Sequence, residues 1–189
     1  MRIIAGLGKG RNLYSPIGNT RPTSDRAREA LFSTLESEFG SINDLTFLDL
    51  YCGSGAVGAE AISRGAAIVY AVDNDEKATA VARQNLELLS NLPGIGTHSV
   101  ITMSAGKFLE KGAELAFDVV FVDPPYELPN NEIEKIMESL VRNGFLKPSS
   151  VIAIERDSKS KPINWPAGLH EVKVRKYGAA TIFYAEPLT

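Results

Sequence analysis

The middle of the chain alternates short apolar segments with amphipathic ones, and this alternation restricts the available folds more than any other feature of the sequence. Seven segments have the apolar or alternating pattern of β-strands, and they are 45–51, 67–73, 98–103, 117–122, 150–156, 169–176 and 181–185. Helical spacing follows each of the first four, over 57–64, 75–90, 104–111 and 132–142. The pattern predicts an α/β fold with a mostly parallel sheet that helices cover on both faces, closed by an antiparallel hairpin.

The N-terminal part of the chain does not follow this alternation. Two short strands on either side of Gly6–Gly10 are expected to form a hairpin, and Thr23 or Ser24 is expected to cap a helix. We therefore predict that residues 1–40 form an N-terminal extension on an α/β domain of residues 41–189.

Composition excludes several classes of protein. The 189 residues are 44% hydrophobic and 23% charged, which is ordinary globular usage. One cysteine, Cys52, excludes a disulfide framework and a thiolate zinc cluster, and the two histidines leave little for a metal site, so we expect no metal. No apolar run reaches the about 18 residues of a membrane helix, and the first residues lack a signal peptide pattern. We expect a cytoplasmic protein without membrane contact and, by size, a monomer.

Charge is distributed unevenly along the chain. The net charge is +5 over residues 1–28, −11 over 29–155 and +3 over 156–189. Basic ends on an acidic body are typical of proteins that bind a polyanion. On charge alone, however, solvated surface side chains are the simpler interpretation.

A glycine-rich segment, Asp49-Leu50-Tyr51-Cys52-Gly53-Ser54-Gly55-Ala56-Val57-Gly58, joins the first strand of the alternating region to its helix. It matches the G-x-G-x-x-G pattern of nucleotide sites, and Asp73 ends the next strand, where a carboxylate can hold two ribose hydroxyls. Asp49 argues against a dinucleotide, because its charge would repel a pyrophosphate. S-adenosylmethionine instead brings an ammonium group for Asp49 and a carboxylate for the loop amides. The loop therefore favours S-adenosylmethionine, and a turn capped by Asp49 is the purely structural alternative.

A second motif, Asp123-Pro124-Pro125-Tyr126, directly follows the fourth predicted strand. Ligands of such sheets bind at the carboxyl ends of the strands. The Asp123 carboxylate and the Pro124 carbonyl can each accept an N–H from the amino group of a base, which aims its lone pair at a methyl carbon. Tyr126 can stack on the same base. The motif predicts methyl transfer to an exocyclic amine, and a strand stop with a turn is the alternative.

With these motifs the sequence resembles the amino methyltransferases of the seven-stranded S-adenosylmethionine-dependent class, whose fourth motif is Asp/Asn-Pro-Pro-Tyr/Phe. More closely, it resembles the bacterial 16S rRNA guanine-N2 methyltransferase family (RsmD family). The segments that carry this resemblance run nearly end to end, and they are Arg2–Gly6, Lys9–Arg11, Arg21–Thr23, Arg28–Phe32, Leu48–Leu50, Gly53–Gly58, Glu60-Ala61, Ser63–Ala66, Val122–Tyr126 and Tyr177-Gly178. The Arg-Pro-Thr block is the narrowest of these and separates the family from other methyltransferases.

The sequence departs from the family pattern at three places. Asp73 replaces the usual Glu, and either carboxylate suits a ribose. Ser104-Ala105 stands where Asp-Ala or Asn-Ala is common near the adenine, and Tyr51-Cys52 stands where Phe-Ala is usual. Cys52 is interpreted as a small residue that fills the turn.

The resemblance implies a Rossmann-like class I methyltransferase with strand order 3-2-1-4-5-7-6. It implies methyl transfer from S-adenosylmethionine, leaving S-adenosylhomocysteine, to the N2 amine of a guanine in 16S rRNA, either naked or in the small ribosomal subunit or an assembly particle. The expected catalytic residues are Asp123, Pro124, Pro125 and Tyr126. The expected cofactor-binding residues are Asp49, Tyr51, Gly53, Ser54, Gly55, Asp73, Asn74, Ser104 and Ala105. The expected RNA-binding residues are Arg2, Lys9, Arg11, Arg21, Thr23, Arg26 and Arg28.

Two other functions fit part of the pattern. An adenine-N6 DNA methyltransferase also uses Asp-Pro-Pro-Tyr, although such enzymes usually carry a larger target-recognition region than 189 residues allow. A nicotinamide-dependent oxidoreductase would share the glycine loop, but Asp49 opposes its pyrophosphate and no hydride-transfer group is evident.

Overall fold

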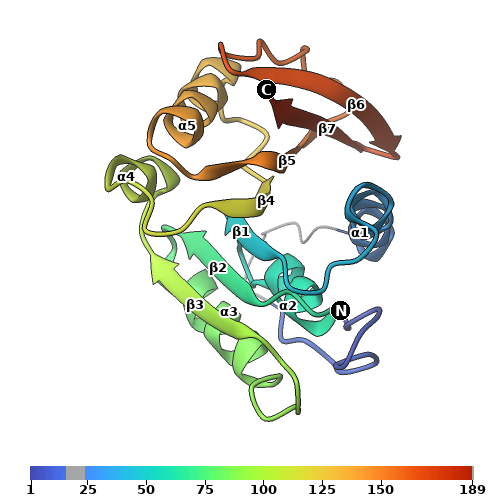
Figure 1. Cartoon of the computed structure of the whole chain (residues 1–189). Helices are drawn as coiled ribbons and strands as arrows, with labels where there is room; N and C mark the ends of the chain where they lie inside the picture. The colour runs from blue at the N-terminus through green and yellow to red at the C-terminus, as the bar shows by residue number, and fades with distance from the viewer. Residues whose placement is uncertain (16–23, 189) are drawn as a thin grey trace.

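A seven-stranded sheet forms the centre of the computed structural model, which describes residues 1–15 and 24–188 (Figure 1). Its strands are β1 (Thr46–Leu50), β2 (Ile68–Asp73), β3 (Thr97–Thr102), β4 (Phe117–Val122), β5 (Leu146–Asp157), β6 (Leu169–Tyr177) and β7 (Ala180–Pro187). The spatial order is β3-β2-β1-β4-β5-β7-β6, with β1 to β5 parallel and β7 antiparallel to both β5 and β6. The expected α/β fold and strand order are therefore confirmed.

Helices cover both faces of this sheet, so the molecule has three layers (Figure 1). The helices are α1 (Asp25–Phe39), α2 (Ala56–Ser63), α3 (Glu76–Glu87), α4 (Ala105–Glu110) and α5 (Asn130–Arg142). The first three pack with Phe47 and Val119 on one face, and α4 and α5 pack with Leu48 and Val120 on the other. Successive strand residues point to opposite faces, so strands that are covered on both sides are apolar throughout. In β4, five of the six residues are hydrophobic, and Asp118 is the exception.

Strand β5 begins at Leu146, four residues before its predicted start, because polar residues hide the beginning of the strand. Leu146 pairs with Phe117, and the register then shifts before Val119 pairs with Val151. Ser150 holds this irregular stretch, since its hydroxyl donates to the Phe117 carbonyl at 2.6 Å and accepts from the Lys147 amide at 2.7 Å. Pairing thus continues through a segment without the hydrophobic signature of a strand.

The N-terminal segment turns back on itself as predicted but forms a single antiparallel bridge, between Arg2 and Asn12, and not two strands. Backbone bonds such as Ile3 N–H to the Arg11 carbonyl, at 3.0 Å, close the turn. Ile3 and Leu13 lie in the same core as α1 and α2. The boundary after residue 40 stays a prediction, since residues on both sides of it share this core.

Glu60 of α2 joins this segment to the helices. Its fully buried carboxylate accepts from the amides of Ile4 at 2.8 Å and Ala5 at 3.0 Å, and from the Arg64 Nε at 2.8 Å. The Arg28 Nε lies 3.6 Å away. Glu60 therefore links the N-terminal backbone to α2, and removing any one of these groups would leave buried polar partners unpaired.

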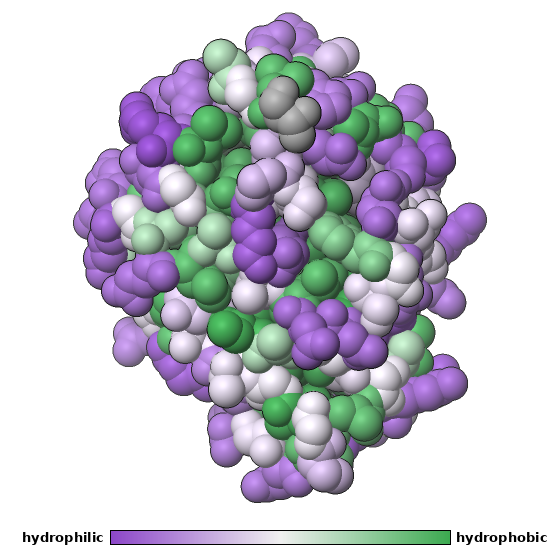
Figure 2. Space-filling model, in the orientation of Figure 1, coloured by the Kyte–Doolittle hydropathy of each residue, from purple (hydrophilic) through white to green (hydrophobic). Residues whose placement is uncertain are grey.

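The outer surface is largely polar. Figure 2 shows hydrophilic residues around most of the outline of this view, with apolar residues toward its middle. None of the helices in residues 24–188 has both the length and the apolar character required to cross a membrane.

Candidate active site

A cavity of about 700 Å³ lies at the carboxyl ends of β1, β2, β4 and β5, a size typical of small-molecule sites. Twelve of the predicted cofactor and catalytic residues line it, and they are Asp49, Tyr51, Gly53, Ser54, Asp73, Asn74, Ser104, Ala105, Asp123, Pro124, Pro125 and Tyr126. Within the described part of the chain, no group of three or more His, Cys, Asp or Glu side chains has the arrangement of a metal site. The topology thus brings the glycine-rich loop and the Asp-Pro-Pro-Tyr motif to the same cavity.

Asp49 is buried at the end of β1, with 1% of its surface exposed. Its Oδ2 atom accepts from the Gly58 amide at 3.0 Å, whereas its buried Oδ1 accepts no hydrogen bond from the described residues. Burial raises the pKa of Asp49 well above its ordinary value, and the carboxylates of Asp123 and Asp73 raise it further, against the lowering effect of the Gly58 amide. A cationic group in the cavity would give Oδ1 a partner and favour the charged form.

Asp73 fixes the glycine loop from the end of β2. Its Oδ2 accepts from the Gly53 amide at 2.9 Å, and its Oδ1 accepts from the Asp75 amide at 2.9 Å. A carboxylate oxygen has a second lone pair, so both atoms can still accept from a ligand hydroxyl. The predicted ribose contact is therefore compatible with the position of Asp73.

The second and third glycines of the loop serve packing. Gly55 does not line the cavity, and a Cβ on it would lie 2.9 Å from the Ala82 Cβ, so it allows α2 to approach α3. A Cβ on Gly58 would lie 3.1 Å from the Val69 side chain of β2. Of the predicted cofactor-binding residues, Gly55 is thus placed outside the cavity wall, where its role is close packing at a φ of 70°.

Tyr51 adopts a left-handed backbone conformation, with a φ of 60°, between β1 and the glycine loop. Such a conformation is uncommon outside glycine and is found preferentially at functional sites. Tyr51 lines the cavity, and burial raises the pKa of its hydroxyl. Burial also raises the pKa of the neighbouring Cys52 thiol, which keeps it neutral and agrees with a residue that fills the turn.

Ser104 caps α4, because its hydroxyl accepts from the Lys107 amide at 3.4 Å. Ser104 and Ala105 line the cavity at the end of β3, and Asn74 lines it after β2. The positions where the family usually has an acid or amide near the adenine are thus at the cavity wall, with a hydroxyl in place of that group.

The Asp-Pro-Pro-Tyr loop leaves the sheet at Asp123, whose amide donates to the Leu50 carbonyl at 3.2 Å. Arg156 of the neighbouring strand β5 holds this loop in place. Arg156 is 3% exposed, and its guanidinium donates to three carbonyls, those of Pro125 at 3.2 Å, Tyr126 at 3.4 Å and Leu128 at 2.7 Å. Burial lowers the pKa of Arg156, and the adjacent acidic groups oppose that shift. A rigid loop with these carbonyls held by Arg156 presents Asp123 and Pro124 to the cavity.

Four of the lining residues that were not predicted for the site lie far from both motifs in the sequence, at the N-cap of α1, in β5 and in the β6–β7 hairpin. These are Ser24, Glu155, Tyr177 and Ala180. Tyr177 belongs to a family segment, which was its only signal in the sequence. The antiparallel pairing of Asp157 with Ala180 brings the hairpin to the end of β5.

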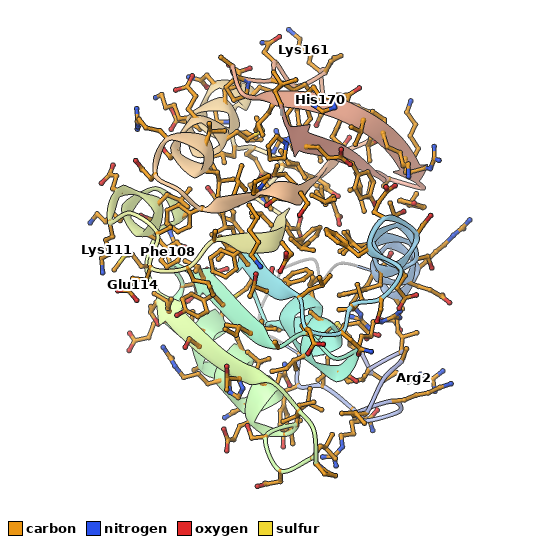
Figure 3. All side chains as sticks on the ribbon, in the orientation of Figure 1. Arg2, Phe108, Lys111, Glu114, Lys161 and His170 are labelled. Carbon is orange, nitrogen blue, oxygen red and sulfur yellow. The ribbon has the colours of Figure 1, made fainter. Side chains whose placement is uncertain are left out.

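The predicted RNA-binding residues divide into three groups. Arg2, Lys9, Arg11 and Arg26 are exposed, as an RNA contact requires. Figure 3 shows Arg2 pointing outward at the end of the molecule opposite Lys161 and His170. Arg21 and Thr23 lie outside the described residues.

Arg28 is a correction to this set. Its side chain is fully buried, donates to the Arg2 carbonyl at 2.6 Å and to Asp25 at 3.0 Å, and faces Glu60. A guanidinium without exposed surface cannot contact RNA in this conformation. Arg28 instead ties α1 to the N-terminal segment.

The strand order, the acids at the ends of β1 and β2, and the Asp-Pro-Pro-Tyr loop after β4 define a class I methyltransferase of the Rossmann-like type. The chain belongs to the family described as Conserved hypothetical protein 95, whose model matches residues 1–186. The family resemblance stated from the motifs is thereby confirmed.

The chain is similar to known proteins over most of its length. Ribosomal RNA small subunit methyltransferase D of Haemophilus influenzae is 36% identical over 182 residues, covering 94% of this chain and 89% of that protein. The protein of the same name from Escherichia coli is 35% identical, covering 98% and 90%. A solved structure, a putative methyltransferase yhhF from Escherichia coli, superposes with a TM-score of 0.84 at 30% identity, covering 100% and 99%.

Proposed function

We propose that this protein is an S-adenosylmethionine-dependent rRNA methyltransferase that modifies the N2 amine of a guanine in 16S rRNA. The observation that carries the proposal is the joint placement of Asp49, Asp73 and the Asp123–Tyr126 loop on one cavity. Two relatives that match nearly the whole chain are named ribosomal RNA small subunit methyltransferases, which supports rRNA as the substrate.

The residues on the β1 and β2 side fit S-adenosylmethionine. The buried, unpartnered Oδ1 of Asp49 suits its ammonium, the amides of the glycine loop suit its carboxylate, and Asp73 suits its ribose. Ser104 and Ala105 would border the adenine. When bound, this cosubstrate supplies a methyl group whose bond to sulfur breaks as the amine lone pair bonds to carbon, leaving S-adenosylhomocysteine and releasing one amine proton.

The Asp123 loop prepares the other reactant. The lone pair of an exocyclic amine is delocalised into the base, which makes the nitrogen a poor nucleophile. Asp123 and the Pro124 carbonyl accept its two N–H groups, concentrate the lone pair on nitrogen and orient it, while Tyr126 stacks on the base. Arg156 binds the carbonyls of Pro125 and Tyr126, which supports a loop that is ordered before the base arrives.

The experiment that tests this function is mass mapping of modified nucleosides in 16S rRNA from cells with and without the gene. We expect one N2-methylguanosine to disappear in the deletion strain and to return with the wild-type gene but not with the Asp123→Ala variant. Purified Asp123→Ala should retain S-adenosylhomocysteine binding, because Asp123 meets the amine and not the methionine tail. Comparing naked 16S rRNA with small-subunit particles in vitro identifies the preferred substrate form, and an unchanged nucleoside map contradicts the proposal.

Exposed basic residues of the N-terminal segment supply the contact with RNA in this proposal. Arg2, Lys9, Arg11 and Arg26 carry it, with Arg21 and Thr23 retained as predictions. Phosphate contacts of this kind position the RNA and carry no base specificity. We expect the protein to act as a monomer.

A further inference from the structure

The cavity extends beyond the residues proposed to bind S-adenosylmethionine, toward the other side of the sheet. In the sheet, β4 separates β1 and β2 on one side from β5 and β7 on the other. Asp49 and Asp73 line the first side, whereas Glu155, Tyr177 and Ala180 line the second. Asp123, at the end of β4, lies between them, so the side of β5 offers space for a base whose amine reaches Asp123.

Glu155 is the charged residue that β5 places on this second side. Val122 pairs with Ile154, so the next residues of the two parallel strands, Asp123 and Glu155, are neighbours at the cavity. Glu155 is 5% exposed. Since β5 alternates, Glu155 points to the same face as Ala153, toward α1, while Arg156 points to the opposite face and holds the Asp-Pro-Pro-Tyr loop.

Asp123 and Glu155 place two neighbouring carboxyl groups at the cavity wall. A carboxylate has only acceptor atoms, and each oxygen can accept more than one hydrogen bond. Two adjacent acids therefore favour a ligand edge with neighbouring donors. A flipped base is commonly read by hydrogen bonds to its Watson–Crick edge. Guanine carries the adjacent N1–H and N2–H donors on that edge, whereas adenine presents the lone pair of N1.

We propose that Glu155 is a specificity-determining residue, which accepts the N1–H of the target guanine while Asp123 accepts from its N2 amine. Adenine has a lone pair at N1 and no hydrogen there. That lone pair would face the lone pairs of the Glu155 carboxylate, so adenine would be rejected. This proposal rests on the proposed function, because it assigns the base that the same cavity takes.

The test uses two RNA fragments around the guanine that nucleoside mapping identifies, one with guanine and one with 2-aminopurine at that position. 2-Aminopurine keeps the 2-amino group but has a lone pair at N1. Rates of methyl transfer are measured in single turnovers with the full-length enzyme in excess. We expect the wild-type enzyme to prefer guanine by about 10- to 100-fold, the range of a hydrogen bond to a charged group.

Glu155→Gln is the decisive variant. A glutamine amide can accept from N1–H or donate to an N1 lone pair. The rates of methyl transfer to guanine and to 2-aminopurine should therefore differ by no more than about threefold, which corresponds to the loss of about one hydrogen bond or more. Glu110→Gln, at the exposed end of α4 and outside the cavity, is the matched control and should keep the wild-type preference. 2-Aminopurine also lacks the O6 atom, but this difference is the same for all three enzymes. A change of preference that occurs only in Glu155→Gln therefore reports on the contact with N1 of the base.

A buried substitution can also disturb folding, so S-adenosylhomocysteine affinity and the melting temperature are measured for each variant. If Glu155→Gln fails these checks, Glu155→Asp replaces it, since it keeps the charge and withdraws the carboxylate by one methylene. Its rate on guanine should fall at least about tenfold at unchanged S-adenosylhomocysteine affinity; an unchanged rate overturns the proposal.

The outcomes separate this proposal from the function on which it rests. A wild-type enzyme that leaves the guanine unmethylated contradicts both. Methylation of guanine and 2-aminopurine at equal rates, or a Glu155→Gln variant with the wild-type preference, overturns the role of Glu155 alone.

Discussion

Asp49 carries an electrostatic cost in the ligand-free protein. Its pKa is raised, chiefly by burial, so the folded state binds the proton more tightly than the unfolded state. Stability from this group is therefore present at low pH and is lost as the pH rises from the unfolded pKa through the raised folded pKa. A cationic group of a ligand beside Asp49 would offset the unfavourable burial of its charged carboxylate.

Replacing Asp49 with asparagine separates stability from binding. We expect Asp49→Asn to raise the melting temperature at neutral pH, by about 2–4 °C for each kcal/mol gained, with a difference from wild type that shrinks as the pH falls. S-adenosylhomocysteine affinity should drop about 10- to 100-fold, because the contact with its ammonium loses its charge. Thermal melts and calorimetry over a pH series check both effects. A variant that is less stable than wild type at neutral pH and binds as tightly would show that Asp49 only caps the turn.

At the residue scale, the sequence predicted the acids at strand ends and missed contacts between distant segments. Asp49, Asp73 and Asp123 each lie at the carboxyl end of a strand with a clear hydrophobic pattern, so their meeting at one edge of the sheet follows from topology. Arg28 looks like any basic residue near a helix start, because its partner Glu60 lies 32 positions away. The packing role of Gly55 depends in the same way on Ala82 of another helix.

At the scale of elements, the loop after β4 depends on β5. The three carbonyls that Arg156 binds span Pro125 to Leu128, so a single guanidinium fixes the shape of the loop. Lysine would keep the charge but cannot reproduce a planar group with several fixed donors. The geometry of the loop, and not its charge, is what the arginine supplies.

Arg156→Lys should therefore lower kcat by about 10- to 100-fold while KM for the RNA and S-adenosylhomocysteine affinity change little, because the base is oriented less well. Arg64→Lys is the control, since the Arg64 side chain is only 8% exposed and is held by Glu36 and Glu60 but lies outside the cavity wall. It should lose stability without this selective loss of kcat. Equal kcat values for Arg156→Lys and wild type in steady-state assays would remove Arg156 from the positioning of the loop.

Most elements could be predicted because a local pattern marks them. The helices and parallel strands have hydrophobic periodicity of their own, and β4 was predicted with its observed bounds. Two elements could not be read correctly. The start of β5 is polar and is held by Ser150, and the N-terminal hairpin is reduced to one bridge because its residues pack on Glu60 and Ser63.

At the scale of the whole molecule, basic residues lie at opposite ends of an acidic protein. Arg2 and Lys161 mark these ends in Figure 3. RNA binding should weaken steeply with salt, and the log–log slope should fall by about 0.7–0.9 for each phosphate that the protein no longer neutralises. We expect Arg2→Glu with Lys9→Glu to reduce this slope and leave S-adenosylhomocysteine affinity unchanged.

The matched double variant at the other end is Lys159→Glu with Lys161→Glu. Titration of the same RNA at several salt concentrations compares the two. A reduced slope confined to the Lys159 and Lys161 variant would assign the RNA contact to the C-terminal segment and not to the N-terminal one.

The position of β7 has a consequence for how the protein is made. β7 is synthesised after the other six strands of the sheet, yet it lies inside the sheet, between β5 and β6. Until it leaves the ribosome, a nascent chain exposes the edge of β5, and β6 has no neighbour with which to pair. Ala180 belongs both to this strand and to the cavity wall. A chain cut before Ala180 therefore lacks an internal strand of the sheet and not an edge strand, and it also lacks part of the cavity wall.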